Sequence, residues 1–472
     1  MARPALTTLV PEEIDKIKAT SLEILERTGV SIAHAHARQV LQAAGAKLEG
    51  ERIRFPPKLV MEALAKAPRQ FTIHARNPGN NITVGAGDPV FAPGYGAPYV
   101  TLASGLKRKA TLADFIKFVK LSGSSSNMGI SGGVLVEPSD VSEKDRHNAM
   151  LYACIVNSDK PFMGSATGEK HARDSLRMAA TLFDSEKGIP HQPVMISLIN
   201  TITPLMLDER MVGALIAYAE AGQPVIIASL GMAGATSPTT LAGTLALQNA
   251  EVLAGITLAQ TIREGTPVVY GSASSITEMR NGSLSIGAPE GAWIIAAAVQ
   301  IAHSYGLPSR AGGCLTDSKI MDIQASYESM MNLQAAGMAG VDFVLHAAGI
   351  LESYMSMSME KFIMDDEICS MVRRFLRGTK VEVEDLAVQL IHEVGPGGQF
   401  LTTDHTYQNF GTEFWQPTLS NRETYDQWRL NESLPIINRA EKRVNEILDN
   451  YEIPYLDRSI ERKLKEMAGI LD

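Results

Sequence analysis

The chain of 472 residues can bury one large hydrophobic core or two ordinary ones, with 45% hydrophobic residues and a mean hydropathy of zero. A net charge of −9 without a clustered Lys/Arg face argues against nucleic acid and anionic membranes as partners. The three cysteines, Cys154, Cys314 and Cys369, are too few and too scattered for a disulfide framework or a CxxC metal site. We therefore expect a globular protein with reduced thiols.

The apolar runs give no sign of a membrane or secretion segment. Charges or glycines interrupt each run well before the roughly 18 residues that a membrane span requires. The opening stretch, MARPALTTLVPEEIDKIK, lacks the apolar core of a signal peptide. We expect a cytoplasmic protein.

Residues 1–110 are predicted to form a helical preface followed by a small β-layer. Helices are expected from Pro11 to the stop at Gly29, from His36 to Ala44 and from Pro57 to Ala65. From Phe71 to Leu102 the chain changes to short β-rich pieces separated by Asn-Pro-Gly, Gly-Asp and Pro-Gly turns. This layer is expected to cover one end of the domain that follows.

Residues 111–366 show a regular alternation of short apolar runs and helical segments. The strands are expected at Met128–Ser131, Pro161–Gly164, Val194–Leu198, Val225–Ser229, Val268–Gly271, Ser309–Gly313 and Phe343–His346, with an eighth near Pro98–Leu102. The helices between them are expected at about 142–157, 169–184, 207–221, 238–264, 288–305 and 320–339. This order favours the α/β class and a closed (β/α)8 barrel, the TIM barrel, over an open doubly wound sheet.

Residues 367–472 are predicted to form a helical extension. Apolar residues recur at helical spacing in its charged last part, for example at Leu434, Ile437, Val444 and Ile447. Such a layer packs either against the outside of the barrel or against another subunit. From its charged helices we expect a homo-oligomer, in the closed form that self-association usually takes.

In α/β barrels the chemistry lies past the carboxyl ends of the strands, so we looked there for site residues. The substrate-binding candidates at these ends are Asn200, Tyr270, Gly312, Gly313, His346, Glu352 and Tyr354. A lone histidine after a strand is as often a hydrogen-bonded core residue as a functional one, so both interpretations of His346 stay open. Lys319 would be the Schiff-base residue of an aldolase or lyase, although a solvated lysine at a helix start is its ordinary interpretation.

No nucleotide or metal site is predicted for this chain. No GxGxxG or Walker loop opens a helix. His34 and His36 form an HxH pair in the preface, where a solvated pair is the simpler explanation. His392 and His405 flank a glycine-rich loop and are the remaining candidate ligands.

Aromatic residues make up only 6% of the chain, yet Tyr95 and Tyr99 lie together in FAPGYGAPYV, and Tyr354 follows the strand at 343. Aromatic faces suit a cation that cannot donate hydrogen bonds, because the ring quadrupole attracts it directly. The alternative is that these segments are simply well-packed loops.

Several ordered motifs carry a resemblance that spans nearly the whole chain. They are NTITPL, GMAGATSPTTLAG, GAPEGA, GGCLTDSK followed by QASYE, and GPGGQFLTTDHT followed by Trp415-Gln-Pro417. The set resembles the trimethylamine methyltransferase superfamily of corrinoid-dependent methyltransferases. Archaeal members carry pyrrolysine inside the barrel, whereas this sequence holds only standard residues, so it is similar to the non-pyrrolysine branch.

The resemblance implies methyl transfer from a quaternary amine, with glycine betaine as the first candidate, to the Co(I) corrinoid (cobalamin) of a separate partner protein, releasing dimethylglycine. A quaternary ammonium leaves as a neutral amine, so no activating residue is required and positioning remains. On this interpretation Tyr95, Tyr99 and Tyr354 surround the trimethylammonium, His346 with Lys319 or Arg310 holds the carboxylate, and Asn200 helps to position the substrate. The alternatives are another betaine (proline betaine, carnitine or γ-butyrobetaine) and a quaternary-amine binding protein without catalysis.

Overall fold

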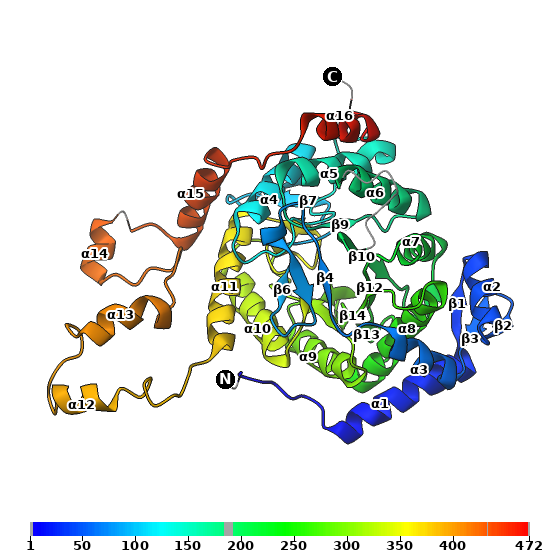
Figure 1. Cartoon of the computed structure of the whole chain (residues 1–472), viewed down its shortest axis with the longest axis horizontal. Helices are drawn as coiled ribbons and strands as arrows, with labels where there is room; N and C mark the ends of the chain where they lie inside the picture. Colours follow the sequence, from blue (N-terminus) through cyan, green and yellow to red (C-terminus); the bar gives the residue numbers. More distant parts are fainter. Residues whose placement is uncertain (1–2, 184–191, 432, 471–472) are drawn as a thin grey trace.

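A closed barrel of parallel strands forms the centre of the computed structural model, which describes residues 3–183, 192–431 and 433–470 (Figure 1). Seven strands pair in the order β6-β18-β17-β14-β12-β10-β9. They are β6 (Val90–Phe91), β9 (Phe162–Gly164), β10 (Met195–Asn200), β12 (Val225–Ser229), β14 (Val268–Ser272), β17 (Ser309–Gly312) and β18 (Phe343–Leu345). Every pairing among them is parallel, as the predicted β/α alternation requires.

Residues 128–132 form the eighth strand segment of the barrel and close it between β6 and β9. Met128 forms a parallel bridge with Phe91. On the other side, the Ser131 N–H donates to the Pro161 carbonyl and the Met163 N–H to the Gly132 carbonyl, both at 2.9 Å. The predicted strand at Met128–Ser131 therefore lies in the barrel wall, although its pairing is short.

The segment near Pro98–Leu102 does form a strand, but the prediction that it is the eighth strand of the barrel was wrong. The first barrel strand is β6, earlier in the chain. Residues Tyr99–Thr101 form β7, which pairs with β8 (Lys107–Lys109) and β20 (Ser356–Met357) in a separate small sheet that also holds β19 (Ile350–Leu351). The strand β6 has only two residues, so its pairing with neighbouring strands defines it, and the sequence alone does not reveal that pairing.

The barrel interior is filled by residues that alternate along the strands. Ile196, Leu198, Ile226, Ala228 and Val269 belong to one buried apolar cluster. The hairpin of β4 (Phe71–Ile73) and β5 (Ile82–Val84) joins the same cluster, and its next residue, His74, donates its N–H to the Pro193 carbonyl just before β10. The hairpin therefore covers the amino ends of the strands and leaves the carboxyl ends as the mouth.

The helices that surround the barrel agree with the predicted positions to within a few residues. They are α4 (Leu112–Ser124), α5 (Glu143–Asn157), α6 (Glu169–Leu182), α7 (Glu209–Glu220), α8 (Leu241–Ile262), α9 (Pro289–Ser304), α10 (Ile323–Ala339) and α11 (Met359–Arg377). Side chains cap several of them: Asp208 accepts from the Met211 N–H at 2.7 Å and Asp322 from the Ala325 N–H at 2.9 Å. Residue 184, the predicted end of the second helix, lies outside the described residues.

Among the described residues, α8 is the one helix that is long and apolar enough to cross a membrane. Of its most apolar window, 83% is buried inside the molecule. It packs against α1 (Pro11–Glu23), α3 (Pro57–Lys66) and α7, so its apolar surface is used in the core.

Short elements before the barrel and at its mouth complete the first part of the chain. A π-helical turn (Ile24–Thr28) extends α1, and α2 (Ala35–Ala43) follows. A second small sheet joins β1 (Val30–Ile32), β2 (Lys47–Glu49), β3 (Arg52–Arg54) and β11 (Met206–Leu207), and a third joins β13 (Met232–Ala233), β15 (Ser275–Glu278) and β16 (Ser283–Ser285). A 3-10 turn lies at Pro78–Asn80.

The chain after α11 divides into two parts. The last helices, α15 (Ile436–Asp449) and α16 (Arg458–Met467), pack on α11 and α4 and on α5 and α6. Between α11 and α15, the short helices α12 (Val388–Val394), α13 (Asp404–Glu413) and α14 (Tyr425–Leu430) stand out to the side of the barrel (Figure 1).

Candidate active site at the mouth of the barrel

A buried arginine on the inner wall is the starting point of the site. Arg310 on β17 pairs in register with Phe343, which faces the interior, so its side chain points inward and is only 2% exposed. Its Nη1 donates to the Ser272 carbonyl at 2.7 Å, while its Nε has no partner, and no carboxylate in the described parts of the chain pairs with it. Burial lowers the pKa of Arg310 to about 10, so the side chain is a cation at neutral pH. A buried charge without a counter-ion is costly, which makes this position a receptor for an anion.

His346 lies one residue past β18 and faces the same space. Its Nδ1 accepts a hydrogen bond from the Tyr95 N–H at 3.2 Å. Burial, followed by the charge of Arg310, holds the pKa of His346 well below its usual value, so the ring is neutral. With Nδ1 accepting, the proton resides on Nε2, for which no partner is found among residues 3–183, 192–431 and 433–470. His346 thus offers one free N–H donor beside Arg310.

Two tyrosines provide aromatic surface at this point. The Tyr354 ring packs on His346 with 4.6 Å between ring centroids and an interplanar angle of 43°. Burial raises the pKa of Tyr354 to about 12, with Arg310 opposing the shift, and burial likewise raises the pKa of Tyr95 to about 12. Both phenols are therefore neutral. Their ring faces can attract a cation without a carboxylate to neutralise it.

The loop from 346 to 354 holds its residues in an unusual backbone conformation. His346, Glu352, Ser353 and Tyr354 have φ values of 63°, 50°, 49° and 74°, in the left-handed region that non-glycine residues rarely adopt. Each such residue costs on the order of 1 kcal/mol or more and persists where surrounding contacts fix it. Strain of this kind concentrates at functional sites, and here it sets the positions of His346 and Tyr354.

Buried hydrogen bonds fix this loop from behind. The Cys314 N–H donates to the His346 carbonyl at 2.9 Å, and Asp365 on α11 accepts from the Gly349 N–H at 2.8 Å. Lys361 forms a buried ion pair with Asp365. Burial raises the pKa of Asp365 to about 6 against the opposing effect of Lys361. These bonds attach the loop to α11 and to the end of β17.

Gly312 ends β17 and Gly313 follows it, and both act through their lack of a side chain. A Cβ on Gly312 would lie 2.4 Å from Leu315, and one on Gly313 would lie 2.6 Å from Val344. At Gly313 the Ala347 Cα is also only 2.8 Å from that position, so a side chain there would displace the backbone that follows His346.

Asn200 ends β10 with its side chain directed inward, since it pairs with Ala228 of the interior cluster. Tyr99 and Glu352 lie together at the rim, where Lys107 links them. The Lys107 ammonium is 4.3 Å from the centroid of the Tyr99 ring and 2.5 Å from Glu352. One face of Tyr99 is thus occupied by a cation of the protein itself.

Tyr270 and Lys319 lie apart from the other predicted residues. In β14, Val269 belongs to the interior cluster, so the adjacent Tyr270 points outward into the helix layer and is fully buried there. Lys319 is exposed, and its Nζ donates to the Asp317 carbonyl at 2.8 Å. The structure therefore brings together Tyr95, Arg310, His346 and Tyr354, with Asn200 across the barrel end.

The sequence matches the profile of the trimethylamine methyltransferase (MTTB) family over residues 2–468. The chain belongs to this family. It is 52% identical to the glycine betaine methyltransferase of Desulfitobacterium hafniense strain Y51, over 98% of this chain and 96% of that protein. It is 32% identical to the trimethylamine methyltransferase MttB of D. hafniense DCB-2 (97% and 92% covered) and 30% identical to the proline betaine:corrinoid methyltransferase of Eubacterium limosum (95% and 94%).

Solved structures show the same fold at low sequence identity. The monomethylamine methyltransferase MtmB of Methanosarcina barkeri superposes with a TM-score of 0.51 at 11% identity, covering 94% of this chain and 93% of that one. A crystal structure of the hydroxylamine complex of MtmB gives the same values. The predicted TIM-barrel fold and the predicted family are both confirmed.

Three residues that support the site of this trimethylamine methyltransferase family member were not predicted from the sequence. A Cβ on Gly133 would lie 3.0 Å from the Tyr95 ring, so this glycine makes room for the aromatic wall. Ser272 holds Arg310 through its carbonyl, and Lys107 organises the rim. The Gly-Gly pair after Met128–Ser131 was the one signal that could have pointed to Gly133, because close backbone approach favours glycine.

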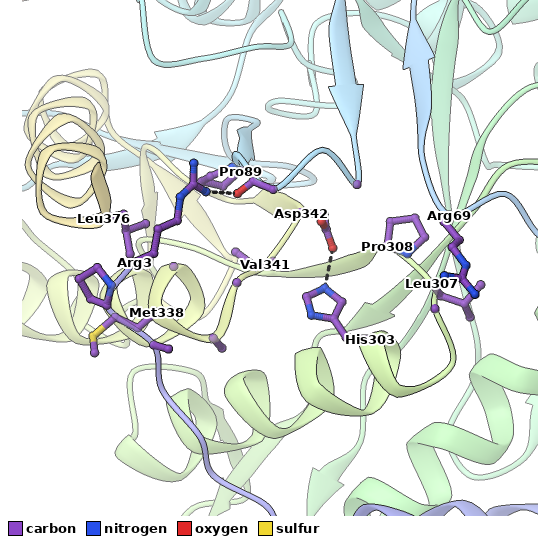
Figure 2. A pocket seen from close by; sticks show the side chains of 18 residues that line it. Arg3, Arg69, Pro89, His303, Leu307, Pro308, Met338, Val341, Asp342 and Leu376 are labelled. Atoms are coloured by element: carbon purple, nitrogen blue, oxygen red, sulfur yellow. Dashed lines mark hydrogen bonds and ion pairs between the residues drawn. The ribbon is translucent and has the colours of Figure 1, made fainter. Parts of the chain in front are cut away.

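A hollow of about 510 Å³ lies at the opposite end of the barrel and is not part of this site (Figure 2). It is lined by residues that precede β17 and β18, including Leu307, Pro308 and Val341. Of its titratable groups, His303 contacts Asp342 at 2.9 Å and Arg3 pairs with Asp88, and Arg69 also lines the hollow. The amino ends of barrel strands serve stability rather than chemistry. The described residues also contain no group of three or more His, Cys, Asp or Glu placed to hold a metal ion.

Proposed function

We propose that this protein transfers a methyl group from glycine betaine to the Co(I) corrinoid of a partner protein and releases dimethylglycine. The observation that carries the proposal is the buried, unpaired guanidinium of Arg310 beside the neutral His346 and the rings of Tyr95 and Tyr354. Glycine betaine combines a carboxylate with a trimethylammonium group only a few bonds away. An anion receptor next to aromatic faces matches both ends of such a molecule.

The chemistry of the substrate explains why the site needs no nucleophile of its own. The Co(I) electron pair forms a bond to one methyl carbon while the C–N bond breaks, and the nitrogen keeps that electron pair as a neutral tertiary amine. No proton is transferred, so the residues only bind and orient. Holding the methyl group at a separation of about 3 Å from its acceptor can supply several kcal/mol of the barrier.

The roles of the residues follow from their placement. Arg310 and the Nε2–H of His346 hold the carboxylate, and the rings of Tyr95 and Tyr354 hold the trimethylammonium. The side chain of Asn200 enters the site from β10 across the barrel end and restricts the substrate from that side. Lys319 does not bind the carboxylate, because its ammonium is exposed and donates to the Asp317 carbonyl.

Similarity to a known enzyme supports the choice of substrate. The relative at 52% identity is named as a glycine betaine methyltransferase, whereas the relative named for trimethylamine is 32% identical. Trimethylamine has no carboxylate and gives a buried arginine nothing to bind. Proline betaine also has a carboxylate on the carbon next to its quaternary nitrogen, and it is the nearest competitor because it differs by a ring that replaces one methyl group and joins the nitrogen to the α-carbon.

The partner protein docks over the mouth, where apolar side chains surround the site. Large hydrophobic residues on the segments that follow the barrel strands, including the start of α10, are 44% to 82% exposed. They are Leu106, Met206, Met279, Ile320, Ile323, Tyr327 and Met355, which we call the rim. A group of exposed apolar side chains such as the rim marks an interaction surface. A methyl acceptor must reach the substrate from this side, because the β4–β5 hairpin covers the other end.

The test is a substrate panel with the purified protein and a reduced corrinoid acceptor. The panel contains glycine betaine, proline betaine, carnitine, γ-butyrobetaine, choline, tetramethylammonium and trimethylamine. Methylation of cobalt is followed by absorbance, and dimethylglycine by mass spectrometry. We expect glycine betaine to give the highest kcat/KM. Methylation from choline or trimethylamine with none from glycine betaine would refute the assignment, and binding of betaine without any methyl transfer would indicate a binding protein.

A further inference from the structure

Residues 378–418, which we call the arm, leave the barrel without forming a core of their own. None of these residues, all of which the structure describes, is buried. The arm contains two helices, α12 and α13, of 7 and 10 residues. Isolated helices of this length are marginal in water, so their stability must come from packing.

Both ends of the arm are fixed to α11, so the arm has a defined position. The Nη2 of Arg374 donates to the Glu413 carbonyl at 2.6 Å, and Trp415 donates to the Ser370 hydroxyl at 2.7 Å. Glu367 then accepts from Thr418 and Ser420, both from the backbone N–H and from the hydroxyl of each. The arm is therefore a long excursion held at its base and not a free tail.

The arm presents a large apolar surface to solvent. Ten hydrophobic side chains are 44% to 79% exposed: Val381, Val383, Leu386, Val388, Ile391, Phe400, Leu401, Tyr407, Phe410 and Phe414. Large side chains carry roughly 150–250 Å² each, so this surface is on the order of 1,000 Å² per copy. Two copies that cover each other's arms would bury on the order of 2,000 Å², the area of a stable homodimer interface.

The location of the arm decides which partner covers it. Near the end of α11, Arg373 donates to the Pro89 and Asn127 carbonyls, which directly precede β6 and the strand segment at 128. The arm begins at 378, so it leaves from the end of the barrel opposite the mouth. A methyl acceptor that faces the mouth of the same barrel is therefore not the molecule that covers the arm.

The charges favour contact between an arm and a neighbouring barrel wall. The arm has one basic residue, Lys380, against six acidic ones: Glu382, Glu384, Asp385, Glu393, Asp404 and Glu413. Two arms facing each other would repel. The exposed face of α11 beside the arm's base offers Met371 and Phe375. Beside them, Arg373 and Arg377 donate to backbone carbonyls of the same chain but form no ion pair with a described carboxylate, so their positive charges complement an acidic, apolar segment.

We propose that the arm packs against the α11 wall of a second copy of this chain, and that the second copy's arm does the same in return. Such an exchange is isologous and closes as a two-fold assembly. It leaves both barrel mouths open for a methyl acceptor. This inference does not depend on the proposed reaction.

The test measures the solution mass of the full-length protein alone, by light scattering coupled to gel filtration at micromolar concentration. Wild type is expected to run at twice the chain mass of 51.0 kDa or a multiple of it. The double variant Leu401→Asp/Tyr407→Asp is expected to run as a monomer. Both side chains are exposed and make no hydrogen bond to the described residues of the single chain. The thermal unfolding of the variant should therefore still show a folded barrel. Tyr455→Asp, equally exposed on the linker before α16, is the matched control and keeps the wild-type mass.

Hydrogen exchange of residues 381–414 gives a second readout in the same samples. A covered arm exchanges slowly in wild type and rapidly in the arm variant. A monomeric wild type, an arm variant with the wild-type mass, or an arm that becomes protected only when the corrinoid protein is added would each overturn the proposal.

Discussion

At the scale of single residues, Arg310 separates substrates with a carboxylate from those without one. Replacing Arg310 by Met removes the anion receptor and fills the same buried position with an unbranched apolar side chain. Charge-assisted hydrogen bonds contribute about 1.5–3 kcal/mol, so kcat/KM for glycine betaine is expected to fall roughly 10- to 100-fold. Turnover of tetramethylammonium should be unchanged, since it has no carboxylate.

The same variant should not lose stability. In the substrate-free protein the guanidinium is buried without a counter-ion, and removing such a charge is neutral or stabilising. Kinetics on both substrates and thermal unfolding check the two statements together. An equal loss of activity on both substrates would show that Arg310 shapes the site rather than binding the carboxylate.

His346 contributes a neutral donor, which predicts both an activity loss and a flat pH profile. Asn tolerates the left-handed backbone at this position but lacks the Nε2–H and the ring that packs on Tyr354, so His346→Asn should lower kcat/KM roughly tenfold or more. Because burial and Arg310 hold the pKa of His346 well below 6.5, wild-type kcat/KM should show no break near pH 6.5. A break there in wild type that disappears in the variant would contradict a neutral role.

At the scale of elements, the strands buried on both faces were predictable because a short apolar run is too brief for a helix. Val225–Ser229 is a strand with the predicted bounds. The phase of alternation within a strand was not predictable. In VVYGS, Val269 faces the interior and Tyr270 the helices, and only the pairing with neighbouring strands decides this. The left-handed residues at 352–354 were also invisible, because none is Gly or Asn.

The contact between α5 and α6 predicts an acid-sensitive stability. His147 bonds to Ser175 at 3.0 Å, and burial, with a smaller effect of His171, lowers its pKa to about 4. Between pH 6.5 and about 4 the unfolded chain binds a proton that the folded chain does not. The free energy of unfolding therefore decreases as the pH is lowered through this window, by up to about 1.4 kcal/mol per pH unit.

Replacing His147 by Gln retains a hydrogen-bonding group and removes the titration. Urea unfolding at pH 7 and pH 5 should show that wild type loses about 2 kcal/mol more than the variant over this interval. Parallel losses in the two proteins would mean that His147 does not titrate differently in the folded and unfolded states.

At the scale of the whole molecule, the site, the rim and the arm occupy different parts of one barrel. Sequence position placed His346 just past one strand and Arg310 within the preceding one, and neighbouring parallel strands bring such residues to the same end of the barrel. The expectation that Tyr99 and Glu352 join them stays a prediction; here Lys107 holds both at the rim. A charge brought in by a strand far away in the sequence, here β8, cannot be predicted from the spacing of residues.

The rim predicts a defect that is specific for the protein acceptor. Ile323 and Tyr327 are exposed neighbours at the start of α10, one helical turn apart, so an aspartate at each introduces charge into the centre of an apolar docking surface. The double variant Ile323→Asp/Tyr327→Asp should raise KM for the corrinoid protein at least about tenfold, as loss of central contacts does. Calorimetric affinity for glycine betaine and methyl transfer to a free reduced corrinoid should stay at wild-type values, because neither requires the rim. Ile453→Asp, exposed far from the mouth, is the control and should change none of the three. Equal losses with the free and the protein-bound acceptor would place the damage in the site itself and remove the rim from the docking surface.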